Sequence, residues 1–96
     1  MNEQIDHIIR QRNLIDDIDN QIFELLAKRF DISKKIGKSK SAYKIPIYDG
    51  SREKDIIKRI SNDYKNKIKP EHAKILLETI FLVSKDIQKL KKISKN

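Results

Sequence analysis

The sequence contains no cysteine and no tryptophan, and it has only two glycines and two prolines among its 96 residues. The absence of cysteine excludes a disulfide framework, thiol catalysis and a thiolate metal site. The shortage of glycine and proline argues against a β-sandwich or an α/β fold, which need frequent turns. No apolar run is long enough to span a membrane. The opening MNEQIDH lacks the basic-then-apolar layout of a secretory signal, so we expect a cytoplasmic protein.

Charged residues, in contrast, are abundant. They make up 38% of the sequence, as hydrophobic residues do, and the formal net charge is +8. This balance is typical of long amphipathic helices. A basic protein can bind nucleic acid or an anionic small molecule, and composition alone leaves both open. The length predicts a single domain over residues 1–96.

Apolar residues at helical spacing predict an all-α fold with three helices. The first runs from about Glu3 to Ala42, the second from Asp49 or Ser51 (either of which can be its N-cap) to Tyr64, and the third from Pro70 through Leu90 or beyond. A helix of about 40 residues is about 60 Å long, whereas a compact globule of this size is roughly 30 Å across. Two shorter helices cannot cover the apolar stripe of the first. We therefore expect an intertwined homodimer, in which the long helices of two chains pack along each other as a helical bundle.

Several polar side chains fall on or beside these apolar stripes, where an unpaired charge is costly. Glu53 lies in the middle of the stripe of the second helix, and Arg29 lies in the middle of the stripe of the first. The other members of this set are Arg12, Lys40, Asp49, Arg52, Ser84 and Gln88.

Taken singly, most of these residues have an ordinary explanation. Arg12 at a stripe edge can reach water along its stem, Lys40 near a helix end can be solvated, and Ser84 can be a small core residue. Glu53 can take part in capping the second helix. Arg29 is the one residue that is anomalous by itself.

Taken together, the set indicates a binding site for an anion. Four cations and two carboxylates give it a formal charge of +4 − 2 = +2, which suits a dianion. Arginine side chains match carboxylates in a bidentate manner. Both histidines, His7 and His72, lie near helix starts and outside the set, so it has no obvious nucleophile or metal site. A reaction here would depend on positioning and electrostatics.

Three stretches, RNLIDDIDNQIFELLAKRFDISKKIGKSK, IPIYDGSREKDI and SKDIQ, resemble the all-helical class of chorismate mutases. The resemblance covers about Glu3 to Lys92. The family's spacing is kept at Arg12, Ile15, Asp19, Leu26, Arg29, Lys40, the Asp49-x-x-Arg52-Glu53 run, Ser84 and Gln88. It implies one chorismate mutase domain per chain, an intertwined dimer with two active sites, and no cofactor or metal.

The resemblance also implies which residues bind the substrate, chorismate. Arg29, together with Arg12 from the other subunit, would grip its two carboxylates. Arg52 and Ser84 would help to bind a carboxylate.

For the remaining residues, the resemblance implies roles at the reacting atoms. Lys40 and Gln88 would hydrogen-bond the ether oxygen that leaves the ring carbon. Glu53, with the Asp49 region assisting, would orient the ring hydroxyl. The implied reaction is the Claisen rearrangement of chorismate to prephenate, on the route to phenylalanine and tyrosine.

Other functions are compatible with parts of this sequence. An isochorismate pyruvate-lyase shares the fold and the basic residues, but such lyases depart from the Asp-x-x-Arg-Glu run that this sequence keeps. A basic, nucleic-acid-binding helical dimer belongs to another class. Against it, the C-terminal lysines spread around the helix, as expected of a solvated surface: Lys85, Lys89, Lys91, Lys92 and Lys95. A regulatory module bound to another enzyme of the pathway also stays open.

Overall fold

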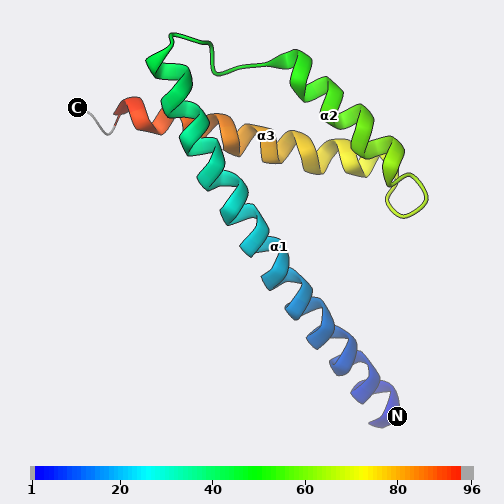
Figure 1. Cartoon of the computed structure of the whole chain (residues 1–96). Coiled ribbons are helices and arrows are strands. Elements are labelled where there is room, and N and C mark those ends of the chain that lie inside the picture. Colours follow the sequence, from blue (N-terminus) through cyan, green and yellow to red (C-terminus); the bar gives the residue numbers. More distant parts are fainter. Residues whose placement is uncertain (1, 94–96) are drawn as a thin grey trace. The chain divides into compact units, whose positions relative to one another are not determined.

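In the computed structural model, which describes residues 2–93 and the side chains of residues 2–89, the chain folds into three helices. These are α1 (Asn2–Ala42), α2 (Gly50–Asp63) and α3 (Pro70–Ile93) (Figure 1). Where the sequence predicts a definite helix end, that end agrees with these bounds to within a residue or two. The all-α fold is confirmed. No helix within residues 2–93 is both long and apolar enough to cross a membrane.

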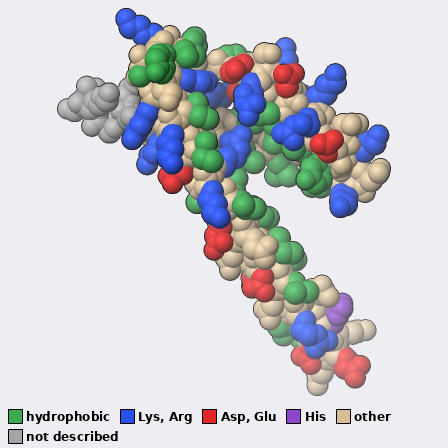
Figure 2. All heavy atoms as spheres, in the orientation of Figure 1, with side chains coloured by type: hydrophobic (Ala, Val, Ile, Leu, Met, Phe, Trp, Pro, Cys, Tyr) green, Lys and Arg blue, Asp and Glu red, His purple; other side chains and the backbone are tan. Residues whose placement is uncertain are grey.

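The chain divides between Asp31 and Ile32 into two units. The first consists of the larger part of α1, and none of the side chains of residues 2–31 is buried in the single chain. Its apolar stripe is 45–65% exposed at Ile5, Ile8, Ile15, Ile18, Ile22 and Leu25. Figure 2 shows apolar side chains on the surface along this helix. A helix of 41 residues is about 60 Å long, as the sequence predicts.

The second unit contains the last turns of α1, together with α2 and α3. Helices α2 and α3 run side by side in opposite directions, joined by residues 64–69 (Figure 1). Ile56, Ile57 and Ile60 of α2 are half-buried, and Ala73 and Phe81 of α3 are the most buried apolar residues, each 4% exposed. This small core holds the two helices together.

The buried face of α3 differs in part from the expected stripe. Leu76, which the periodicity placed on the stripe, is exposed, whereas Phe81 is buried. Ser84 is also buried, and Ile80 and Ile87 beside it are half-buried. The face is therefore centred near Ser84, and Leu76 lies to one side of it.

Candidate active site

Helix α1 ends in a Schellman motif that begins at Lys40. The Ile45 N–H donates to the Lys40 carbonyl (2.7 Å), and the Lys44 N–H donates to the Ser41 carbonyl (3.3 Å). Lys44 has a φ of 56°, in the left-handed region that favours glycine. The turn brings the chain back over the last turn of the helix.

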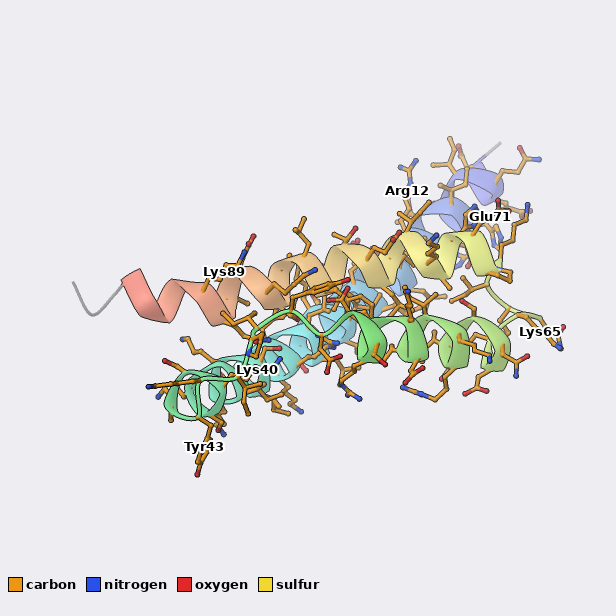
Figure 3. The ribbon with its side chains drawn as sticks, turned by 90° about the horizontal axis from the view of Figure 1, so that it is seen from above. Arg12, Lys40, Tyr43, Lys65, Glu71 and Lys89 are labelled. Atoms are coloured by element: carbon orange, nitrogen blue, oxygen red, sulfur yellow. The ribbon has the colours of Figure 1, made fainter. Side chains whose placement is uncertain are left out.

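The same turn fixes the Lys40 side chain. Its Nζ donates a hydrogen bond to the Ile47 carbonyl at 2.8 Å, in a half-buried position. Figure 3 shows Lys40 where the end of α1 meets the segment leading to α2. The ammonium carries three protons, so this bond restrains Lys40 and leaves it further donors.

The start of α2 is set by Asp49. Its side chain accepts a hydrogen bond from the Arg52 N–H at 3.1 Å, which makes Asp49, and not Ser51, the N-cap. Asp49 and Arg52 are both exposed. In a capping box the carboxylate stands three residues after the N-cap. Glu53 stands four residues after Asp49, so it does not form one.

Glu53 forms an ion pair with α3 instead. Its Oε2 lies 3.2 Å from the Nζ of Lys85, and the two side chains are only 24% and 26% exposed. The ammonium of Lys85 also lies 4.9 Å from the centroid of the Tyr48 ring, a cation–π arrangement. Lys85, which the sequence assigned to a solvated surface, is thus a half-buried partner of Glu53.

Gln88 lies where α1 meets α3. A Cβ added to Gly37 would stand 3.0 Å from the Gln88 Cα, so a larger residue at this position would require α3 to shift. The Gln88 Oε1 is buried and has no hydrogen-bond partner among the described residues. Buried polar atoms are nearly always paired, so this amide is a candidate for contact with a ligand. Turning the amide over would place its NH₂ donor at the same point.

The structure therefore brings six of the eight predicted site residues into the 32–93 unit. The contacts Lys40–Ile47, Asp49–Arg52, Glu53–Lys85 and Gly37–Gln88 join the end of α1, the start of α2 and the last turns of α3. The six residues are Lys40, Asp49, Arg52, Glu53, Ser84 and Gln88. The other two, Arg12 (exposed) and Arg29 (half-buried), lie on the first unit. Residues 32–93 thus contain a cationic donor (Lys40), a buried amide (Gln88) and a carboxylate held by an ion pair (Glu53).

Sequence reasoning did not predict the contacts of Glu53 with Lys85, of Lys85 with Tyr48, and of Lys40 with the Ile47 carbonyl. A signal for the first contact was present, because a carboxylate on an apolar stripe needs a cationic partner. Lys85, next to the predicted Ser84, is such a cation. The Tyr48 ring and the Ile47 carbonyl gave no comparable signal, because both lie in a segment without regular structure.

Comparison with known proteins agrees with the resemblance read from the sequence. The family model described as chorismate mutase type II matches residues 11–89. A chorismate mutase of Methanocaldococcus jannaschii is 41% identical over 56 residues, which are 58% of this chain and 57% of that protein. The aligned segment thus spans little more than half the length of this relative. No solved structure matches the chain significantly.

Proposed function

The chain belongs to the type II chorismate mutase family, and from that premise we propose that it rearranges chorismate to prephenate. The observation that carries this proposal is the extent of the family match. It begins one residue before Arg12 and ends one residue after Gln88, so it includes every predicted site residue.

We propose that the substrate's two carboxylates are bound by cations. Arg29 and, from the partner chain, Arg12 together grip the two carboxylates, and Arg52 and Ser84 assist. Bidentate arginine contacts fix both position and orientation. Gripping both carboxylates folds the substrate so that the two carbons to be joined meet, which removes much of the entropic barrier.

Lys40 and Gln88 would act on the bond that breaks. As the ether C–O bond lengthens ahead of C–C bond formation, negative charge grows on the ether oxygen. A pre-positioned donor in a dry site is typically worth about 3–4 kcal/mol against such a charge. The restraint of the Lys40 ammonium at Ile47 and the burial of the Gln88 amide support this role. No proton transfer and no covalent intermediate are needed.

Glu53 would orient the ring hydroxyl of the substrate, and the region of Asp49 would assist. The half-buried position of Glu53 on the α2 face supports this assignment. In the structure Asp49 caps α2, so its contribution is to fix where the helix starts and thereby where Glu53 lies.

The same proposal includes a homodimer. In the single chain the most buried apolar side chains are Ala73 and Phe81, while the α1 stripe is about half exposed. Covering a half-exposed isoleucine or leucine is worth about 1 kcal/mol, and a second copy of α1 offers a matching stripe. The unfolding midpoint should then rise with protein concentration, and a monomer in sedimentation experiments at micromolar concentration would contradict the dimer.

Incubating the purified protein with chorismate tests the activity. We expect the absorbance of chorismate to fall while prephenate appears. A parallel reaction with isochorismate tests the lyase, which would release pyruvate. Turnover of isochorismate without turnover of chorismate would replace the proposed function by the lyase activity.

A further inference from the structure

We propose that Lys85 is a positioning residue, which holds the Glu53 carboxylate at the orientation needed to meet the substrate's ring hydroxyl. This rests on the proposed function, since it is there that Glu53 has a substrate group to orient. Lys85 itself needs no contact with the substrate. It acts through Glu53.

The first support is the place of the ion pair between two helices. Glu53 lies on the face of α2 that carries Ile56 and Ile57, and Lys85 directly follows the buried Ser84 on α3. The 3.2 Å contact therefore joins α2 to α3, with both side chains about three-quarters buried. An exposed ion pair contributes little and is screened by salt. A largely buried pair is screened less, and removal of one partner leaves the other charge without compensation.

The second support is a restraint on Lys85 itself. Its ammonium lies 4.9 Å from the Tyr48 ring centroid, so the cation is held between a carboxylate and an aromatic face. The Tyr48 hydroxyl in turn lies directly over Gly50, where a Cβ would collide with it. A long lysine side chain ordinarily samples many rotamers, and these two contacts restrict it to one region.

The third support is the order of these residues along the chain. Ile47 is fixed by Lys40, Tyr48 contacts Lys85, and Asp49 caps α2. These three successive residues therefore contact the end of α1, α3 and the start of α2, in that order. Of the groups in contact with these residues, the Lys85 ammonium is the one that pairs with the Glu53 carboxylate.

The test begins with activity toward chorismate in four variants. Lys85→Met keeps the aliphatic stem and removes the charge, and we expect kcat/KM to fall about 10-fold, mostly in kcat, because a misplaced catalytic contact costs up to about 100-fold. Lys85→Arg, which keeps the charge, should remain within about threefold of wild type. Lys89→Met is the matched control: it makes the same change one turn later, at an exposed position labelled in Figure 3, and should match wild type. The fourth variant combines Lys85→Met with Glu53→Gln, and its reference is Glu53→Gln alone.

The double variant separates positioning from a general structural role. If Lys85 acts through Glu53, adding Lys85→Met to Glu53→Gln should change kcat/KM less than about twofold. A further 10-fold fall in that background would show that Lys85 acts independently of Glu53. Wild-type activity of the Lys85→Met single variant would equally overturn the proposal.

A structural measurement keeps the test independent of the proposed function. Crystal structures of the wild type and of Lys85→Met should show the Glu53 carboxylate displaced from its wild-type position in the variant. An unmoved carboxylate would overturn the positioning role, whatever the substrate. A wild-type protein that leaves chorismate unchanged would instead refute the proposed function.

Discussion

Gly37 of α1 lies against Gln88 of α3, so closely that a Cβ on Gly37 would stand 3.0 Å from the Gln88 Cα and 3.1 Å from its Cβ. The contact joins the last turns of α1 to the helix that carries two of the predicted site residues. It therefore fixes the position of the Gln88 backbone, and with it the buried amide.

Gly37→Ala is expected to destabilise the protein, although alanine favours helices. The helical preference is worth about 1 kcal/mol, whereas overpacking costs about 1–3 kcal/mol. The obstructing atom belongs to the backbone, so it cannot move aside as a side-chain tip can. We expect a net loss of about 1 kcal/mol, measured by urea unfolding at fixed protein concentration, and a fall in activity because Gln88 is displaced. Lys38→Ala at the next, exposed position is the control, and an increase in stability of Gly37→Ala would contradict the packing.

Lys44→Gly is expected to stabilise the protein. A non-glycine residue in the left-handed region costs about 1–2 kcal/mol, and Lys44 occupies it with φ 56°. Part of this gain is lost because glycine is more flexible in the unfolded chain, so the net gain should be about 0.5–1 kcal/mol. Lys38→Gly within α1 should instead cost about 1 kcal/mol. Equal losses in both variants would show that residue 44 does not need the left-handed conformation.

Mixing two inactive variants tests whether Arg12 acts across the dimer, because activity then returns only if the two arginines of one site come from different chains. Arg12→Ala and Arg29→Ala should each be nearly inactive as homodimers. A heterodimer of the two has one intact site, with Arg12 from one chain and Arg29 from the other. The measurement is activity after the two proteins are unfolded and refolded together, with each protein refolded alone as the control. Proven heterodimers that stay inactive would place Arg12 in the site of its own chain.

The helices could be predicted closely because their signals are local. Pro70 begins α3, and α1, whose apolar periodicity extends to Ile36, continues without a proline to Ala42. The choice between Asp49 and Ser51 as N-cap was left open, since both residue types cap helices well and only the geometry shows that Asp49 accepts the Arg52 N–H. The periodicity also places Leu76 on the stripe of α3, whereas the face of α3 that is buried in the single chain is centred near Ser84, because it depends on where α2 packs.

The sequence proposes the members of the candidate site, but it does not indicate which residues they contact. Glu53 was conspicuous as a carboxylate on an apolar stripe, yet its contact with Lys85 depends on the register between α2 and α3. Sequence spacing within one helix carries no information about that register. The hydrogen bond from Lys40 to the Ile47 carbonyl likewise follows from the turn at Lys44, a position where sequence rules favour glycine.

The pH dependence of a Gln88→Glu variant tests the contact between Gln88 and the ether oxygen. The amide of Gln88 does not titrate, so the wild-type rate should have no acid-side requirement from this position. A carboxyl group here donates a hydrogen bond only when it is protonated, and once ionised it also opposes the negative charge that grows on the oxygen. We therefore expect kcat/KM of Gln88→Glu to fall with rising pH as a single deprotonation, and to approach wild type only in acid. At neutral pH the loss should be about 100-fold or more, as for the removal of one oxyanion donor. The measurement is a pH–rate profile of both proteins from about pH 4 to 8, with circular dichroism at each pH to confirm folding. Gln88→Met, which has no donor and nothing to titrate, should stay poorly active throughout. If wild type and Gln88→Glu gave parallel profiles, Gln88 would not touch the reacting oxygen, and the donor there would have to be Lys40 alone.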